Sequence, residues 1–190
     1  MESDRIKWNE RYSGRGVFFS LAPSRFLAQS LELVFGLVQG RRALDLACGE
    51  GRNAIFMAQN GFDVDAVDIA ERGVERGGDR SRGLGLDVNF LQADLESYRL
   101  KPGYDLIVDF NFLLRPLIPS MVESLTPGGV IVMETVMAAP GLPGEHNPEF
   151  LLQPGELERL FSGLAGSILT VEEEPSRETP VARLLFRKDL

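Results

Sequence analysis

Cysteine and long apolar runs are nearly absent from this sequence, and each absence excludes a class of protein. The single cysteine, Cys48, excludes an internal disulfide framework and the common zinc-binding spacings. No apolar run approaches the length that crosses a bilayer, and the first residues, MESDRIKWNERYSG, lack the apolar centre of a signal peptide. We therefore expect a soluble, cytoplasmic protein that has no membrane contact and no bound metal.

An excess of basic residues is also missing. Lysine and arginine number 20 against 28 acidic residues, so the formal net charge is -8. General attraction to a phosphate backbone is therefore absent, and we expect no nucleic-acid partner. A length of 190 residues with 44% hydrophobic side chains suits one globular domain with a buried core, present as a monomer or a homodimer.

Strand-like and helix-like segments alternate over most of the chain. Apolar residues at helical spacing predict the first helix over 24–39. Strands are expected at 43–47, 63–69, 87–94, 104–110 and 129–136, and the helices between them at 52–59, from Glu71, and at 117–125, where the turn 127–129 follows. Such alternation requires crossovers, which build a Rossmann-like, doubly wound, mostly parallel α/β sheet.

The last quarter of the chain has a different pattern. A loop rich in proline and glycine, 138–148, leads to a short helix from Pro154. Two strand-like segments, 167–174 and 180–188, then follow with only a turn-rich gap between them. Strands so close in sequence pair antiparallel, so we expect a hairpin at the sheet edge and seven strands in all.

The stretch LDLACGEGRN, residues 44–53, carries the main ligand-binding signal. Small residues stand between a strand end and a helix start, where a ligand can reach backbone N–H groups that a side chain would otherwise cover. Gly49, Gly51 and Ala54 also satisfy the dinucleotide pattern GxGxxG/A. Asp68, at the end of the second strand, suits the ribose hydroxyls of either a dinucleotide or S-adenosylmethionine, so these residues leave both open.

Three features favour S-adenosylmethionine over a dinucleotide. Asp45 lies just before the turn, where a carboxylate suits the ammonium group of a methionine tail and repels a pyrophosphate. The third strand is followed by QADLE, in which Asp94 can accept from an adenine amino group while Leu95 packs on the ring. The carboxyl-terminal hairpin is the third feature, because an ordinary dinucleotide-binding half-domain does not need one.

A resemblance to a known family rests on these same motifs. LDLACGEGRNAIFMAQNGFDVDAVD, QADLE, YDLIVDFN and LTPGG together resemble class I S-adenosylmethionine-dependent methyltransferases, closest in pattern to the tellurite-resistance methyltransferase family. The resemblance implies S-adenosylmethionine as cofactor, S-adenosylhomocysteine as product, and methyl transfer to a small molecule. It also implies a methyltransferase domain over 24–190 and a lid over 1–23, although a segment docked on the core is an equal interpretation of Trp8, Arg11 and Tyr12.

The resemblance extends to single residues. It places Gly49 and Gly51 beside the methionine moiety and Asp109 near the sulfonium or the amine. The residues expected to bind the cofactor are Tyr12, Asp45, Ala47, Gly49, Gly51, Asn53, Asp68, Ile69, Asp94, Leu95, Asp109 and Phe110. The chain departs from the family at Ala47, where many members have glycine. The late stretch that carries histidine and arginine in the family offers here only Arg177 and Arg183, which argues against tellurite as substrate.

The acceptor is expected above the carboxyl ends of the strands, near Phe18, Asn111, Phe112 and Arg115. If a base is needed, Glu134 and His146 are the candidates, although His146 also fits a solvated loop histidine. Methyl transfer is an in-line displacement that requires mainly alignment and exclusion of water, so no nucleophile–base pair is expected. Two alternatives stay open: an NAD-dependent oxidoreductase, and a non-catalytic module that binds S-adenosylmethionine or S-adenosylhomocysteine.

Overall fold

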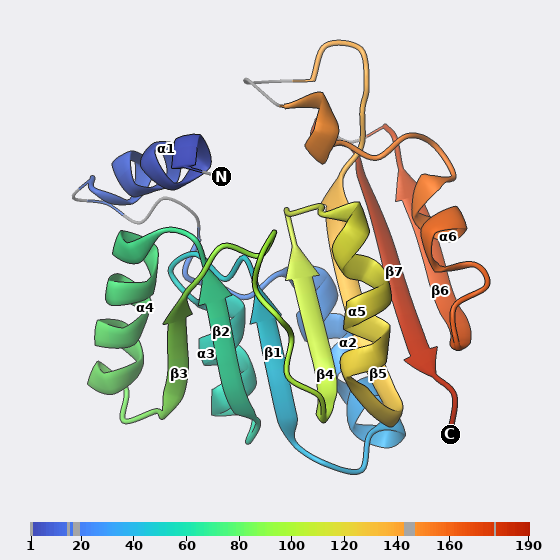
Figure 1. The fold of residues 1–190 in the computed structure, drawn as a ribbon, viewed down its shortest axis with the longest axis horizontal. Coiled ribbons are helices and arrows are strands. Elements are labelled where there is room, and N and C mark those ends of the chain that lie inside the picture. The colour runs from blue at the N-terminus through green and yellow to red at the C-terminus, as the bar shows by residue number, and fades with distance from the viewer. Residues whose placement is uncertain (1, 15, 17–19, 143–146, 177) are drawn as a thin grey trace.

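The computed structural model describes residues 2–14, 16, 20–142, 147–176 and 178–190. A seven-stranded sheet forms its centre, with strand order β3-β2-β1-β4-β5-β7-β6 (Figure 1). The strands are β1 (Arg42–Leu46), β2 (Asp63–Asp68), β3 (Val88–Gln92), β4 (Tyr104–Phe110), β5 (Leu125–Val136), β6 (Gly166–Glu174) and β7 (Val181–Lys188). β1 to β5 are parallel, while β7 pairs antiparallel with both β5 and β6. The expected Rossmann-like sheet with a carboxyl-terminal hairpin is confirmed.

Helices cover both faces of the sheet. They are α1 (Glu2–Tyr12), α2 (Arg25–Leu37), α3 (Arg52–Gln59), α4 (Glu71–Gly83), α5 (Ile118–Ser124) and α6 (Glu156–Phe161), with short 3₁₀ turns η1 (Arg115–Leu117) and η2 (Pro148–Phe150). None of the helices in the described ranges is long and apolar enough to span a membrane.

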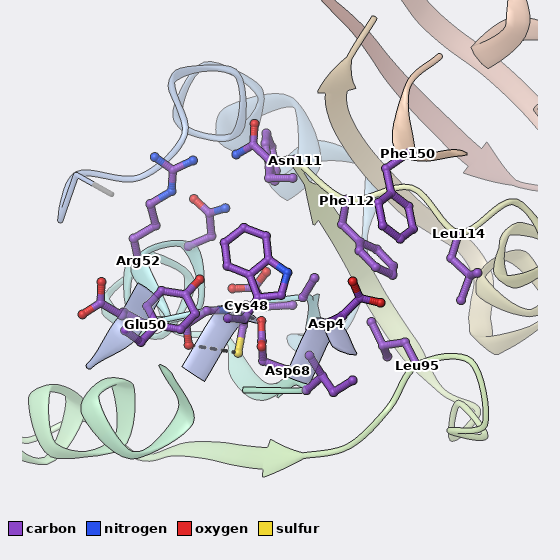
Figure 2. A pocket seen from close by; sticks show the side chains of 18 of the residues that line it. Asp4, Cys48, Glu50, Arg52, Asp68, Leu95, Asn111, Phe112, Leu114 and Phe150 are labelled. Carbon is purple, nitrogen blue, oxygen red and sulfur yellow. Dashed lines mark hydrogen bonds between the residues drawn. The ribbon is translucent and has the colours of Figure 1, made fainter. Parts of the chain in front are cut away.

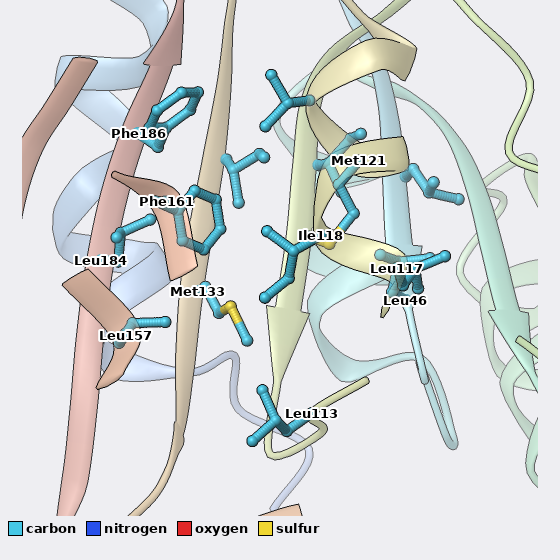
Figure 3. Close-up of a cluster of buried hydrophobic side chains, with 14 of the residues drawn as sticks. Leu46, Leu113, Leu117, Ile118, Met121, Met133, Leu157, Phe161, Leu184 and Phe186 are labelled. Carbon is cyan, nitrogen blue, oxygen red and sulfur yellow. The ribbon is translucent and has the colours of Figure 1, made fainter. Parts of the chain in front are cut away.

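Two apolar clusters fill the space between the helices and the sheet. Leu27, Leu31 and Val34 of α2 and Met57 of α3 pack on one face. Figure 3 shows the cluster on the other face, where Met121 of α5 and Phe161 of α6 lie against β4, β5 and β7. Burial of both sheet faces explains why the central strands are continuous apolar runs rather than alternating patterns.

Two predicted boundaries are wrong. A helix, α1, precedes the helix expected to be first, because its polar sequence carries little apolar periodicity and it forms a surface element above the sheet. Residues 127–129 are more than a turn after a helix, because β5 begins at Leu125 and contains them. The pairing shifts from Tyr104–Leu125 to Leu106–Val130, so these residues form an irregularity within the strand.

Candidate active site

A cavity of about 160 Å³ lies at the carboxyl edge of the parallel strands. Figure 1 shows α1 lying above this edge, next to α4, and Figure 2 shows the cavity from close by. Most of the predicted cofactor-binding residues line it: Tyr12, Asp45, Ala47, Gly49, Asn53, Asp68, Ile69, Asp94, Leu95 and Phe110. This edge is the usual ligand site of an open α/β sheet, because the crossovers diverge there.

The glycine turn joins β1 to α3 through left-handed backbone. Ala47, Gly49 and Gly51 have φ of 51°, 54° and 72°. A side chain at Gly49 would place its Cβ 2.5 Å from the hydroxyl of Tyr12, so Gly49 permits the close approach of α1. A Cβ at Gly51 would lie 2.4 Å from the ring of Phe90 instead. Gly51 therefore serves packing and does not line the cavity, whereas Gly49 does.

Asp68 holds the turn in place. Its Oδ2 accepts a hydrogen bond from the N–H of Gly49 at 2.7 Å, and its Oδ1 accepts from the N–H of Ala70 at 2.8 Å. Burial raises the pKa of Asp68, and the two backbone bonds oppose that effect. Each carboxylate oxygen has a second acceptor site, so these bonds leave capacity for ligand hydroxyls.

Asp45 supports the start of α3. Its Oδ2 accepts from the N–H of Ala54 at 2.9 Å, which satisfies one of the free donors in the first turn of the helix. Burial raises the pKa of Asp45 to about 7, and the charge of Asp68 adds to the rise. Because this pKa lies near neutral pH, a cationic ligand beside the carboxyl group lowers the pKa and converts the group to its charged form.

Asp109 does not line the cavity. It lies in β4 opposite Leu46 of β1 and Met133 of β5, and its side chain is buried. Within the described ranges, no hydrogen-bond partner reaches its Oδ1. Burial, with the charge of Asp45 as a second cause, raises the pKa of Asp109 well above its ordinary value. The burial of Asp109 away from the cavity was not predicted from the sequence, because an aspartate at a strand end is usually solvated.

Arg76 of α4 fastens the amino-terminal segment over the cavity. Its guanidinium donates to the carbonyl oxygens of Tyr12 at 2.7 Å, Gly14 at 3.0 Å and Gly16 at 2.8 Å. The same group forms an ion pair with Glu50 of the glycine turn at 3.0 Å. The end of α1, the residues that follow it and the glycine turn are therefore held by one side chain.

The amino-terminal segment also supports α4 directly. Asn9 of α1 accepts through its Oδ1 from the backbone N–H of Arg72, a free donor in the first turn of α4. Trp8 and Tyr12 stack with ring centroids 5.9 Å apart and both line the cavity. Burial raises the pKa of Tyr12, so its hydroxyl stays protonated at neutral pH.

Aromatic side chains form the far wall of the cavity. Phe112, which follows β4, and Phe150 of η2 lie with ring centroids 6.3 Å apart, and Leu114 lies beside them in Figure 2. Asn111 also lines the cavity, with a left-handed φ of 61°, and its N–H donates to the carbonyl of Glu134 at 2.8 Å. The predicted acceptor residues Asn111 and Phe112 are therefore brought together at the cavity.

Other predicted site residues lie elsewhere. The guanidinium of Arg115 pairs with Glu156 and donates to the carbonyl of Leu151, so it fastens the segment after β5 rather than lining the cavity. Glu134 pairs with Arg183 of β7 at 2.5 Å and is likewise not among the lining residues. Phe18 and His146 lie outside the described residues.

Several lining residues were not predicted. Cys48 and Glu50 belong to the glycine turn itself, so their position in the motif was the available signal. Arg52 begins the helix that follows it. The remaining unpredicted lining residues are Asp4, Trp8, Ser20, Arg80, Glu96, Leu114 and Phe150. Asp4, Trp8 and Ser20 belong to the segment 1–23 that was expected to form a lid, Glu96 belongs to the motif QADLE, and Phe150 ends a loop, 137–150, that was expected to border the acceptor. Arg80 and Leu114 carry no local pattern that points to a ligand, because folding brings them to the cavity.

The strand order and the glycine turn at the carboxyl edge define an α/β protein with the fold of S-adenosylmethionine-dependent methyltransferases. The crystal structure of TehB from Haemophilus influenzae has this fold, with a TM-score of 0.72, 20% sequence identity, and alignment over 97% of this chain and 67% of that one.

Sequence comparison extends the relationship from fold to family. The profile described as tellurite resistance protein TehB matches residues 28–174, which is most of the chain, so the chain belongs to this family. A probable S-adenosyl-L-methionine-dependent methyltransferase TehB of Haemophilus influenzae is 25% identical over 127 residues, 63% of this chain and 44% of that protein. A 23S rRNA (uracil(747)-C(5))-methyltransferase of Pyrococcus abyssi is 32% identical over 113 residues, 55% of this chain and 28% of that protein. The chain thus spans less than two thirds of the length of these relatives.

Proposed function

We propose that this protein transfers a methyl group from S-adenosylmethionine to a small-molecule acceptor. One observation carries the proposal: carboxylates from the ends of three neighbouring strands face a single cavity beside a glycine turn. Asp45 lies in β1, Asp68 ends β2, and Asp94 follows β3. Family membership and the methyltransferase names of the relatives also support methyl transfer from S-adenosylmethionine.

The donor groups of the cavity fit this cofactor. Acidic lining side chains outnumber the two lining arginines, Arg52 and Arg80, which suits a ligand with an ammonium and a sulfonium charge. Gly49 lines the cavity, and its left-handed backbone is a conformation that glycine adopts without strain. When bound, S-adenosylmethionine supplies a methyl group on a positively charged sulfur that leaves as a neutral thioether.

Each side chain has a proposed task toward the cofactor. Asp45 faces the ammonium group while it supports α3, and Asp68 accepts from the ribose hydroxyls with the lone pairs that its backbone bonds leave free. Asp94 accepts from the adenine amino group, and Leu95 packs on the ring. Residues 1–23 serve as the lid and 24–190 as the methyltransferase domain, since α1 lies above the cavity.

The chemistry then rests on alignment and on exclusion of water. Phe112 and Phe150 orient an acceptor from the far wall, and Trp8 and Tyr12 close the cavity from above. Glu134 is held by Arg183, so we assign it to support of β5 and β7 rather than to proton transfer. A role for His146, the location in the cytoplasm and a monomeric or homodimeric state stay predictions from the sequence.

Calorimetric titration tests the proposal. S-adenosylmethionine, S-adenosylhomocysteine and NAD are titrated into the wild-type protein, into Asp68→Ala, and into the matched control Asp63→Ala, an exposed residue at the other end of β2. We expect the two sulfur ligands to bind and the Asp68 variant to bind them about 10-fold or more weakly, because a charge-assisted hydrogen bond is lost. Binding of NAD alone would contradict the proposal.

An acceptor screen follows. It contains small molecules and, because an rRNA methyltransferase is among the relatives, ribosomal RNA. Transfer to small molecules is the expected result. Transfer to RNA alone would contradict the small-molecule acceptor, and cofactor binding without any transfer would favour a non-catalytic binding module.

A further inference from the structure

The far wall of the cavity, where the acceptor must lie in the proposed function, is apolar. Phe112, Leu114 and Phe150 line it, and Leu95 lies at its lower edge in Figure 2. The two phenyl rings are tilted by 31°, which leaves ring faces and edges to contact a flat or branched apolar group. A small acceptor with an apolar body fits these side chains.

A charged group, Asp4, faces this apolar wall from above, and the neighbours of Leu95 in the sequence, Asp94 and Glu96, also line the cavity. Asp4, in the first turn of α1, lines the cavity, and Figure 2 shows its carboxylate on the same side of the cavity as Phe112, Leu114 and Leu95. Within the described ranges, the Asp4 side chain makes no hydrogen bond and no ion pair. A carboxylate beside apolar walls attracts a cation more strongly than a fully solvated one does, because the local dielectric is lower.

The lining arginines are engaged elsewhere. The guanidinium of Arg52 donates to the hydroxyl of Ser24 at 3.0 Å, and that of Arg80 donates to the carbonyl of Glu50 at 2.9 Å. Figure 2 shows Arg52 on the side of the cavity opposite Asp4 and Phe112. Among the described lining residues, no cation is therefore placed to hold an oxyanion against the aromatic wall.

We propose that the acceptor is a small, largely apolar amine whose nitrogen is bound by Asp4. This inference rests on the proposed methyl transfer and names the substrate class for it. The carboxylate of Asp4 holds the protonated amine while Phe112 and Phe150 contact its apolar body. The same carboxylate can take up the proton that the nitrogen must lose before its lone pair can accept a methyl group. The site disfavours an oxyanion such as tellurite by like-charge repulsion.

Trp8 supplies a direct readout of binding. It is the only tryptophan of the chain, and it lines the cavity on the same helix as Asp4. Its fluorescence is followed while three probes of similar shape are added: 2-phenylethylamine, 2-phenylethanol and phenylacetate, with tellurite as a fourth. The titrations are run with and without S-adenosylhomocysteine, which occupies the cofactor site without reacting.

The expected result is a preference for the amine over the alcohol and the carboxylate by about 10-fold or more. Asp4→Asn is expected to abolish this preference and Asp4→Glu to retain part of it. Glu10→Gln, which removes an exposed acidic side chain outside the lining set of the same helix, is expected to leave it unchanged. Circular dichroism and thermal unfolding establish that each variant is folded.

Three results would overturn the inference. The first is that the alcohol, the carboxylate or tellurite binds as tightly as the amine or more tightly. The second is an amine preference that survives in Asp4→Asn, and the third is no binding of the amine. If S-adenosylhomocysteine binds while the amine preference is absent, the acceptor class is wrong and the methyltransferase proposal stands. If the amine binds with the expected preference but S-adenosylhomocysteine does not bind, the methyltransferase proposal fails instead.

Discussion

Single residues of the cavity serve the fold and, in the proposed function, also bind the ligand. Asp45 and Asp68 each accept backbone hydrogen bonds that shape the turn between β1 and α3, and each also faces the cavity. For such residues the structural and the functional interpretation are compatible, because a carboxylate has more acceptor sites than the backbone uses. A variant that retains the hydrogen bond and removes the charge separates the two roles.

Asp45→Asn is that variant. The folded-state pKa of Asp45, about 7, lies above its ordinary value of 3.8, so the folded protein binds more protons than the unfolded chain between these pH values. The free energy of unfolding therefore falls as pH rises through this window. We expect Asp45→Asn to lack this contribution. The melting temperature of the variant minus that of the wild type should therefore rise between pH 4 and pH 8.

Cofactor affinity gives the second readout for Asp45→Asn. The asparagine oxygen can still accept from Ala54, but the charge that we propose for contact with the ammonium group of the cofactor is gone. We expect S-adenosylhomocysteine to bind about 10-fold more weakly in calorimetry. An unchanged affinity would limit Asp45 to support of α3, and parallel pH profiles of the two melting temperatures would contradict the assigned pKa.

At the scale of elements, the packing of α4 explains its unusual composition. Its sequence, ERGVERGGDRSRG, is rich in glycine, which lowers helix propensity. A Cβ at Gly73 would lie 3.0 Å from the carbonyl oxygen of Gly49, and one at Gly77 would lie 2.5 Å from the ring of Phe90. The glycines let α4 lie close to the glycine turn after β1 and to β3.

Two glycine substitutions on α4 are expected to have opposite signs. Gly77→Ala should lower the free energy of unfolding by about 1–3 kcal/mol, because the added carbon overlaps the ring of Phe90. Gly83→Ala, where nothing lies within 4 Å of the added carbon, should raise it by up to about 1 kcal/mol. Urea denaturation of both variants measures the difference, and a stabilised Gly77→Ala would refute the packing argument.

The attachment of α1 to α4 is tested through Arg76. Arg76→Ala removes three hydrogen bonds to carbonyl groups of residues 12–16 and the ion pair with Glu50. We expect faster hydrogen exchange in residues 2–14 and weaker binding of S-adenosylhomocysteine. Arg72→Ala is the control, because among the described residues the Arg72 side chain pairs only with Glu75, on the exposed surface. Equal exchange in both variants would contradict the role of Arg76.

At the scale of the whole molecule, one cavity joins elements from both halves of the sheet. The cavity takes side chains from α1, from the turn after β1, from the end of β2, and from η2 near residue 150. A ligand that binds only this folded arrangement raises the stability of the entire chain. Thermal unfolding therefore reports on the site without any assumption about the acceptor.

S-adenosylhomocysteine at about 100 times its dissociation constant should stabilise the protein by about 2.7 kcal/mol. For a domain of this size the melting temperature should rise by about 5–11 °C. NAD at the same concentration should produce no shift, and Asp68→Ala should lose most of the rise. A shift with NAD and none with S-adenosylhomocysteine would contradict the assigned cofactor.

The sequence by itself determined the sheet, the hairpin and the turn. Continuous apolar strands alternate with helices, and the glycines of residues 44–53 stand between a strand and a helix, so local pattern is enough to predict them. Asp45, Asp68 and Asp94 could be placed at the cavity in advance because the carboxyl ends of parallel strands share one edge. The length of β5 was not predictable, because residues 126–129 resemble a turn and form the irregularity between Leu125 and Val130, the residues on either side of it that pair with β4.

Only the tertiary structure decided which distant side chains share the cavity. Asp4 and Phe150 both line it although 145 positions separate them, and no local pattern links them. Arg115 and Glu134, expected near the acceptor, instead pair with Glu156 and Arg183. The physical reason is that a charged side chain near a strand end takes the partner that folding brings closest, and the choice depends on long-range packing that sequence periodicity does not encode.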